Sequence, residues 1–482
     1  MKRTTITLLS ITLAGVVGLS ALILPNLFQE DCDVLKVANW AEYIDEGDAE
    51  EGTNSMVEDF EIWYEEQTGR KIRVEYCVAD DNETLYNMLK MGDQFDLVCP
   101  SEYMIMKLVA EKESYLQPLP DSFFDKSIAT NYYVNNLSPF IAQTFKDNTM
   151  KTHDGTARWE EYAAGYMWGT TGFVYTPNDL VDEGDVKDWN VFLNKDYAQQ
   201  ITAKNNVRDT YFTGLAIHYD DLLTQLKQDY TNGVIAKEEY QATLREKMND
   251  SSIETMDQVH GILKNLADNL YGFETDEGKA KMLAGDLAVN YQWSGDAANI
   301  IYEAEFDDEG NRRENAVDLY YSIPDTVSNL WFDAWVLTKD CRNVDAATMF
   351  INFLARPDNA IRNMYYIGYT SCSVGSYDFE DEDPTNDVDV FSDYVLGEYE
   401  DEDGSVEYDL NYYFNPEYDG TDAKRNDAYV FTTTEKESKR RLLAQYPLED
   451  DLVRCVAMQF FEGDANERAN LMWSDVTFFW PF

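Results

Sequence analysis

The sequence predicts a mixed α/β protein built from two lobes that the chain crosses more than once. Its 482 residues exceed the roughly 100–200 residues that one domain ordinarily uses. Short apolar runs alternate with helical periodicity in two stretches, one starting near residue 35 and the other near residue 166, and the pattern returns near residue 330. Strands that alternate with helices favour a parallel sheet covered on both faces.

The first stretch contains three expected strands and three expected helices. The strands are 35–39, 72–78 and 95–99, and the helices are 56–67, 84–91 and 104–111. Apolar residues at positions 56, 57, 60, 63 and 64 have helical spacing. Gly69 fits the left-handed position that ends a helix, and Asp80 with Glu83 suggests a capping box. Pro100 stops the third strand.

The second stretch repeats this alternation and then returns. We expect strands at 171–175 and 287–292, a helix at 211–219 and a polar helical region at 221–270. Near residue 330 a further strand (334–337) and helix (346–354) follow. The return of the pattern predicts a second crossing between the lobes.

The charge balance limits the possible functions. With 38 Lys and Arg against 91 Asp and Glu, the formal charge is −53. Such a chain repels phosphate, which excludes a sequence-independent nucleic-acid binder, and it favours cationic partners. A hydrophobic share of 44% and an aromatic share of 14% exclude a disordered acidic chain. The three histidines, at 153, 218 and 260, are too scattered to support a His-based metal site or triad.

The N-terminus indicates export. Lys2 and Arg3 precede a run without charge from residue 4 to residue 28. The run exceeds a usual cleavable segment and is long enough to span a bilayer, so an uncleaved anchor and a cleaved signal both remain open. Either interpretation places the remaining chain outside the cytoplasm. The residues before Cys32 are polar, which disfavours a lipoprotein.

Six cysteines leave the disulfide pairing open, because six thiols allow 15 connectivities. Cys77 and Cys99 each close an apolar run, and we expect them to be buried thiols. From 376 to 420 the chain has 17 Asp or Glu and no Lys or Arg. We expect a solvated, partly ordered surface insertion there. A calcium site or an electrostatic funnel for cations are the functional alternatives, although the spacing is not that of an EF-hand.

The residues that follow the expected strands carry the functional signal. In open α/β sheets, ligands bind beyond the carboxyl ends of the strands. Aromatic and acidic residues recur at these places, including Trp40 after the first strand, Trp293 with Asp296, and Trp331 with Asp333. Aromatic faces attract cations and cover methylene groups, and carboxylates accept bonds from ammonium groups. The set suits a slender chain with cationic ends, which describes a polyamine.

The sequence resembles the extracytoplasmic spermidine/putrescine-binding proteins of ABC transporters over roughly residues 34–375. The resembling segments are 37–44, 86–103, 166–172, 293–296, 331–333, 351–357 and 367–370. The resemblance implies an α/β, two-lobe type II periplasmic-binding-protein fold with a hinge and an interlobe cleft. It implies ligand-binding roles for Trp40, Tyr43, Ser101, Tyr103, Asp209, Trp293, Asp296, Trp331, Asp333 and Tyr369.

The chain departs from this family at two positions. Ala41 stands where members often carry a hydroxyl, and Asn206 stands where spermidine-type members can carry a second carboxylate. The segments 220–252 and 376–420 look like insertions.

The resemblance also implies an organisation and a function. We expect a signal or anchor with spacer (1–33), lobe 1 (34–160), lobe 2 (161–330), a return crossing with the second part of lobe 1 (331–375), an acidic insertion (376–428) and a C-terminal region of uncertain lobe (429–482). The expected function is capture of putrescine or spermidine outside the cytoplasm and delivery to an ABC-transporter permease. No catalysis, cofactor, metal or nucleic acid is expected, and membrane attachment would run through the N-terminal segment.

Three rival functions stay open. The first is a binding protein for another small cationic solute, and the second is a sensor of the same fold without transport. The third is a glycoside hydrolase, which also combines aromatic platforms with two carboxyl groups roughly 5–9.5 Å apart.

Overall fold

A computed structural model describes residues 32–478 except 49–51, 178–180, 276, 308–309 and 380–384. The expected signal or anchor at 4–28 therefore lies outside the described residues, as does part of the acidic run. Among the helices that the structure describes, none is both long and apolar enough to cross a bilayer.

The strands are β1 (Cys32–Trp40), β2 (Lys71–Ala79), β3 (Leu97–Val98), β4 (Thr149–Lys151), β5 (Thr156–Arg158), β6 (Ala163–Tyr175), β7 (Ile201–Lys204), β8 (Gly272–Glu274), β9 (Val289–Trp293), β10 (Tyr320–Ser322), β11 (Ser328–Leu337), β12 (Thr370–Ser371), β13 (Ser376–Tyr377), β14 (Val388–Asp389), β15 (Val406–Asp409), β16 (Val430–Thr433) and β17 (Cys455–Val456).

The α-helices are α1 (Met56–Thr68), α2 (Asn82–Met91), α3 (Glu102–Ala110), α4 (Tyr132–Asn136), α5 (Pro139–Asp147), α6 (Val207–His218), α7 (Asp220–Thr231), α8 (Lys237–Lys247), α9 (Ile253–Ala267), α10 (Glu277–Leu283), α11 (Ser294–Glu305), α12 (Val344–Leu354), α13 (Pro357–Ile367), α14 (Gly397–Tyr399), α15 (Asn411–Phe414), α16 (Arg441–Gln445), α17 (Glu449–Leu452) and α18 (Asp464–Thr477). Short 3₁₀ helices are η1 (Asp121–Phe124), η2 (Trp159–Glu161), η3 (Asp185–Lys187), η4 (Trp189–Leu193), η5 (Lys195–Tyr197), η7 (Asp427–Tyr429) and η8 (Glu437–Lys439), and η6 (Val390–Leu396) is a π-helix.

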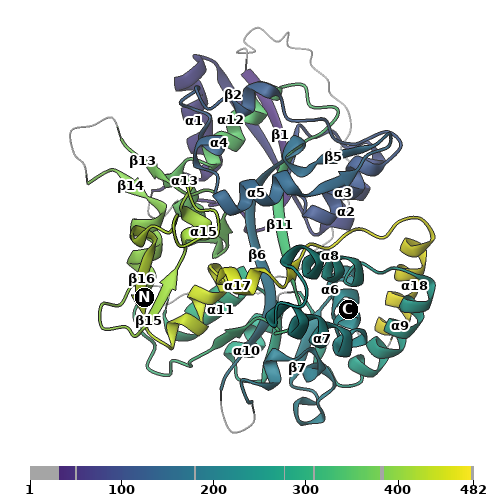
Figure 1. The fold of residues 1–482 in the computed structure, drawn as a ribbon. Coiled ribbons are helices and arrows are strands. Elements are labelled where there is room, and N and C mark those ends of the chain that lie inside the picture. Colours follow the sequence, from purple (N-terminus) through teal and green to yellow (C-terminus); the bar gives the residue numbers. More distant parts are fainter. Residues whose placement is uncertain are drawn as a thin grey trace, which may run out of the picture.

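Two long strands join the lobes, as Figure 1 shows. The main sheet has the order β2-β1-β3-β11-β6-β9-β7-β8. β6 pairs with β11 over residues 163–170 and then changes partner, so that residues 171–175 pair with β9. Because β6 and β11 belong to both halves of the sheet, they connect lobe 1, which holds β1–β3, with lobe 2, which holds β7–β9. The two crossings that the sequence predicts are these strands.

Most expected elements are confirmed with shifted ends. The helix expected at 56–67 is α1, and Gly69 caps it in the left-handed region with φ 69°. The expected capping residue of α2 was wrong by one position, since Asp81, and not Asp80, accepts from the Thr84 amide. The expected parallel sheet is only part of the structure. β1 is parallel to β2 and β3, and β7 to β8 and β9, whereas the crossing strands β6 and β11 run antiparallel to each other, to β9 and to β3.

The acidic run is not the solvated insertion that its charge indicates. Residues 376–379 and 385–433 form two small two-stranded antiparallel sheets and η6, and most of their aromatic side chains pack in or against the main core. Tyr413 stacks on Trp168 of β6 with ring centres 5.4 Å apart, and the Trp168 Nε1 donates to its hydroxyl at 2.9 Å. The reason is the interleaved Tyr and Phe residues: their rings pack inward while the carboxylates between them face water.

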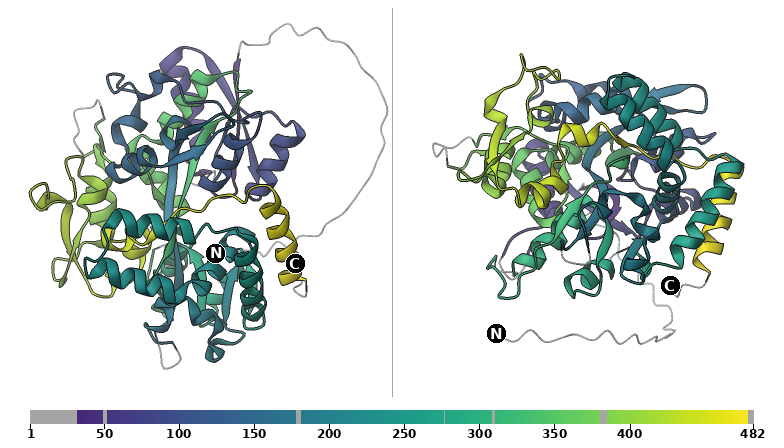
Figure 2. Two further views of the ribbon diagram at one scale, coloured as in Figure 1. Left: turned by 45° about the vertical axis from the view of Figure 1, so that its right-hand side comes forward. Right: turned by 60° about the horizontal axis from the view of Figure 1, so that its bottom comes forward.

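The C-terminal segment 457–463 touches both lobes, and Figures 1 and 2 show it passing between them before α18. On lobe 2, Arg208 of α6 donates to the Gln459 carbonyl at 2.6 Å, and Asn249 accepts from the Gln459 amide at 2.8 Å. On lobe 1, Lys151 of β4 pairs with Glu462 at 2.9 Å. We call residues 457–463 the strap.

All six cysteines lie in the described part of the chain and are free thiols. The expectation for Cys99 is confirmed, since it is fully buried, whereas Cys77 on β2 is only half-buried. The domain boundaries given above remain predictions.

Candidate functional site

Asp333, in the middle of β11, is the centre of a buried hydrogen-bond cluster. Tyr43 donates its hydroxyl to Asp333 Oδ2 at 2.8 Å, and Ser101 donates to Oδ1 at 2.6 Å. The Trp40 side chain is a third hydrogen-bond partner. Burial raises the pKa of Asp333 to about 6, and these hydrogen bonds oppose the rise. These neutral donors fix the position of the Asp333 carboxylate, but they carry no positive charge that would balance its negative charge.

The three donors come from two strand ends of lobe 1. Trp40 is the last residue of β1, and Glu42, with φ 52°, turns the chain so that Tyr43 follows at once. Ser101 follows β3 and precedes α3. Asn82 of α2 fixes Ser101 through two hydrogen bonds of 2.9 and 3.0 Å. Because β1 and β3 are parallel neighbours, the polar residues that follow their carboxyl ends lie close together, as the sequence predicts.

A row of aromatic rings extends from this cluster toward lobe 2. Tyr43 meets Tyr369 edge-on with ring centres 5.4 Å apart, and Tyr369 meets Trp331 at 5.3 Å. The Trp331 indole donates to the Thr170 carbonyl at 3.0 Å. A Cβ on Gly295 would lie 2.1 Å from the Tyr369 ring, so the first turn of α11 packs directly against this row.

Asp209 is the corresponding carboxylate of lobe 2. Asn206 caps α6 and accepts from the Asp209 amide at 3.2 Å. Asp209 is 4% exposed, and its Oδ1 has no hydrogen-bond partner among the described residues. Burial raises its pKa to about 6, against the opposing effects of the Lys204 ammonium and a hydrogen bond from Trp293. An acceptor buried in this way is costly until a donor arrives.

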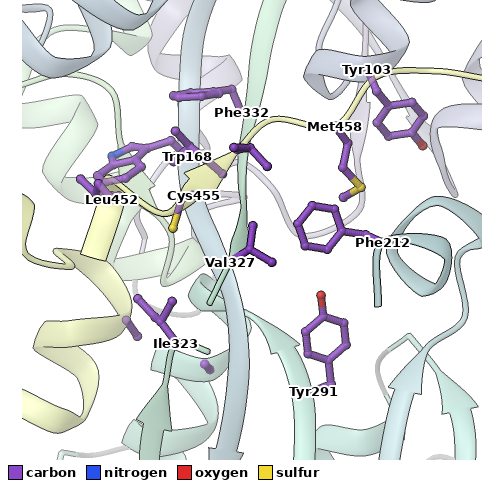
Figure 3. Close-up of a cluster of buried hydrophobic side chains, with 14 of the residues drawn as sticks. Tyr103, Trp168, Phe212, Tyr291, Ile323, Val327, Phe332, Leu452, Cys455 and Met458 are labelled. Atoms are coloured by element: carbon purple, nitrogen blue, oxygen red, sulfur yellow. The ribbon is translucent and has the colours of Figure 1, made fainter. Parts of the chain in front are cut away.

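Tyr103 connects the two lobes. Its hydroxyl lies 3.3 Å from Glu83 Oε1 in lobe 1, and the Asn206 side chain of lobe 2 is a further hydrogen-bond neighbour. Burial raises the pKa of Tyr103 well above its usual range, and the charges of Glu83 and Asp209 add to the rise. Figure 3 shows Tyr103 in the same buried cluster as Phe212 of α6.

Glu102 is an acidic residue that the sequence analysis missed. Its Oε2 accepts from the Phe332 amide at 3.2 Å, and its Oε1 is buried with no hydrogen-bond partner in the described chain. Burial raises its pKa to about 8, and the charges of Asp333 and Asp209 contribute. At neutral pH Glu102 is therefore mostly neutral. Its position between Ser101 and Tyr103 was the signal that could have identified it.

Two lysines, also missed, bind acids on the lobe 2 side. Lys279 of α10 pairs with Asp296 of α11 at 2.7 Å. Lys204 is fully buried, lies 3.8 Å from Glu274, and places its Nζ 3.9 Å from the centre of a Trp293 ring. Lone lysines on a polar helix or strand end give no sequence signal, so only the structure reveals these pairs.

The structure places nine of the ten residues expected at the site in two sets of contacts where the lobes meet, whereas Asp296 pairs with Lys279. One set of contacts runs through Asp333, Tyr43, Tyr369 and Trp331, and another through Tyr103, Asp209 and Trp293; Asp296 lies one residue beyond Gly295. Their roles in binding remain predictions. The described residues contain no group of three or more His, Cys, Asp or Glu arranged to hold a metal ion.

Comparisons with known proteins agree with this architecture. The model of the bacterial extracellular solute-binding protein family matches residues 55–392. The chain is 24% identical over 379 residues to the spermidine/putrescine-binding periplasmic protein of Salmonella typhimurium, covering 78% of this chain and 88% of that protein. It is 27% identical over 334 residues to the putrescine-binding periplasmic protein PotF of Escherichia coli (strain K12), covering 67% of this chain and 74% of that protein.

Solved structures show the same fold. The spermidine/putrescine ABC transporter substrate-binding protein PotD of Streptococcus pneumoniae aligns with a TM-score of 0.54 and 22% identity, covering 92% of this chain and 99% of that one. The TpPotD lipoprotein of Treponema pallidum aligns with a TM-score of 0.56 and 18% identity, covering 92% and 100%. The two-lobe binding-protein fold is therefore confirmed, and with the family model matching most of its length, the chain belongs to the bacterial extracellular solute-binding protein family.

Proposed function

We propose that this protein binds a polyamine, putrescine or spermidine, outside the cytoplasm and delivers it to the permease of an ABC transporter. The names of the relatives support the ligand class. The observation that carries the proposal is the pair of buried carboxylates, Asp333 from β11 and Asp209 from lobe 2, each of which has aromatic side chains as hydrogen-bond neighbours. Asp209 Oδ1 still lacks a hydrogen-bond donor among the described residues.

The site geometry suits each part of such a ligand. Ammonium groups pair with Asp333 and Asp209, which supply charge in a low-dielectric setting. The indoles of Trp40, Trp293 and Trp331 cover the methylene chain, a role that rings fill through apolar area and cation–π attraction. Tyr43, Ser101, Tyr103 and Tyr369 position these groups, and Asp296 adds a third acid on the lobe 2 side.

Binding also explains why the site lies between lobes. A ligand that bridges Asp333 and Asp209 contacts both lobes only when they are together, so its differential affinity favours the closed form. The closed form is then the state that a permease recognises. We propose capture and release without bond chemistry, and export through the N-terminal segment.

A thermal-shift screen followed by isothermal titration tests the ligand class. Putrescine, cadaverine, spermidine and spermine are the probes, because a ligand at 100 times its Kd stabilises the fold by about 2.7 kcal/mol. At least one of them should raise the melting temperature. If none of the four does, the polyamine proposal is wrong.

The Asp333→Asn variant tests the assigned site. A charged hydrogen bond contributes about 1.5–3 kcal/mol, so we expect the Kd to rise by about tenfold or more. Asp345→Asn is the matched control, because Asp345 is an exposed carboxylate on α12 of the same lobe. Equal affinity of Asp333→Asn and wild type would refute the site.

Delivery requires a second measurement. The purified chain with polyamine should stimulate ATP hydrolysis by the reconstituted permease–ATPase complex to which it delivers the ligand. A protein that binds polyamine with no such complex as partner would instead be a sensor.

A further inference from the structure

We propose that Glu102 is a further ligand-responsive residue of this site, a buried carboxyl group that releases its proton to solvent when a polyamine binds and so adds a negative charge near the cation. The inference rests on the proposed function and specifies its electrostatics. In the sequence, Glu102 lies between Ser101, which donates to Asp333, and Tyr103, which connects the lobes.

The Glu102 carboxyl group is fixed inside lobe 1. Glu102 is 3% exposed and is the first residue of α3, where the N-terminal end of the helix favours an ionised carboxylate. Its Oε2 accepts from the Phe332 amide at 3.2 Å, one residue before Asp333 on β11. Its Oε1 has no hydrogen-bond partner among the described residues. A buried carboxylate with one unpaired oxygen is costly, so the group keeps its proton until a positive charge arrives.

A hydrogen-bond donor for the ionised form is already present. Trp159 of η2 lines the same small cavity as Glu102, and its Nε1 is likewise buried without a partner in the described part of the chain. The other elements around this cavity contribute uncharged side chains, among them Phe145 of α5, Met150 of β4 and Phe332 of β11. The cavity therefore offers an ionised carboxylate a donor, but no positive charge.

Charges from both lobes act on Glu102. Burial is the main cause of its raised pKa of about 8, and the charges of Asp333 on β11 and Asp209 on α6 add to the rise. Arg208 on α6 and Tyr103 on α3 are its other electrostatic neighbours. A ligand whose ammonium groups pair with Asp333 and Asp209 neutralises the two charges that oppose ionisation. The pKa of Glu102 therefore falls on binding, and the complex holds fewer protons than the free protein.

The test is the number of protons released when putrescine or spermidine binds at pH 7.5, measured by isothermal titration in buffers of different ionisation enthalpy. At this pH Asp333 and Asp209, with pKa values of about 6, are almost fully ionised, whereas Glu102 is still mostly protonated. We expect wild type to release about half a proton, and Glu102→Gln, which cannot ionise, to release less than about 0.1. Equal release by the two proteins would overturn the inference.

The affinity should follow the same protons. Linkage requires the wild-type Kd to fall about threefold from pH 7 to pH 8, and the Kd of Glu102→Gln to stay within about 1.3-fold. Glu111→Gln is the matched control, because Glu111 lies at the other end of α3 and accepts from the Tyr86 hydroxyl instead. Its proton release should equal that of wild type.

Glu83 is the other glutamate of the site with a raised pKa, since it is buried next to Tyr103. Proton release that disappears in Glu83→Gln and persists in Glu102→Gln would overturn the inference. If Glu102→Gln does not fold, the pH series decides: a Kd that still falls from pH 7 to pH 8 in Glu83→Gln supports Glu102, and a constant wild-type Kd refutes it. A wild-type chain that binds neither polyamine at any pH would refute the proposed function itself.

Discussion

Two aspartates of the site titrate near neutral pH, so ligand binding should be coupled to the release of protons from their carboxyl groups. Burial raises the pKa of both Asp333 and Asp209 to about 6, above the ordinary value of 3.8. Between those values the folded chain binds more protons than the unfolded chain. These groups therefore stabilise the fold fully below about pH 4, and the contribution is lost as the pH rises through 6.

Polyamine affinity should rise with pH over the same window. The ligand requires ionised carboxylates, so we expect the Kd to fall by about tenfold for each of the two groups between pH 5 and pH 7. Titration in buffers of different ionisation enthalpy should also detect proton release on binding. In Asp333→Asn only one group remains, so its pH dependence should be about half as steep in log Kd. An affinity that does not vary between pH 5 and pH 7 would contradict the raised pKa values.

At the scale of elements, the first turn of α11 is positioned by a glycine. Gly295 leaves no room for a Cβ, which would lie 2.1 Å from the Tyr369 ring. α11 can therefore approach the aromatic row that runs from Trp331 to Tyr43. The glycine at this place has a packing function, because a helix interior otherwise favours alanine.

Gly295→Ala should reverse the usual benefit of alanine in a helix. Alanine is favoured over glycine by about 0.8–1 kcal/mol, but overpacking costs about 1–3 kcal/mol, so the clash dominates. We expect a lower free energy of unfolding in urea and weaker polyamine binding. Gly261→Ala on α9, where nothing outside the surrounding helix backbone lies within 4 Å of the added Cβ, should instead stabilise the fold. If both variants gain stability, the close approach of α11 to Tyr369 is wrong.

Elements were predictable where local periodicity decides the structure. α1 with its Gly69 cap and the strand β1 follow from the spacing of apolar residues, and so do the polar ends that reach Asp333. The acidic run was misjudged because charge density says little about where Tyr413 and its neighbours pack. The antiparallel crossing depends on pairings between β6 and β11, which are more than 150 residues apart, and no local pattern encodes them.

At the scale of the whole molecule, a charge of −53 surrounds the proposed cation-binding site. The summed field attracts polyamines toward the protein and also repels the chain from itself. The family resemblance led to the prediction of ten site residues, and their roles in binding stay a prediction. Lys279 and Lys204 were not predictable, since their effect depends on which acid each one meets in three dimensions.

Added salt should therefore act in opposite directions on stability and on binding. Raising NaCl from 50 to 500 mM screens the self-repulsion, so the melting temperature without ligand should increase. The same change should raise the Kd for putrescine by roughly threefold to tenfold. Scanning calorimetry measures the melting temperature, and isothermal titration measures the Kd for putrescine. Binding that tightens with salt would point to an apolar ligand instead of a cation.

The contacts of the strap with lobe 2 are stronger than its contact with lobe 1, and this difference determines with which lobe α18 moves. Its Lys151–Glu462 pair is exposed and contributes about 0–1 kcal/mol, whereas Arg208 is buried, and leaving its guanidinium without the Gln459 carbonyl would cost about 1–3 kcal/mol. If the lobes separate, we expect the Lys151–Glu462 ion pair on β4 to break before the hydrogen bonds of the strap to lobe 2. We therefore expect the C-terminal helix α18 to move with lobe 2, so that a fluorophore attached to it would report any rotation of that lobe against the other.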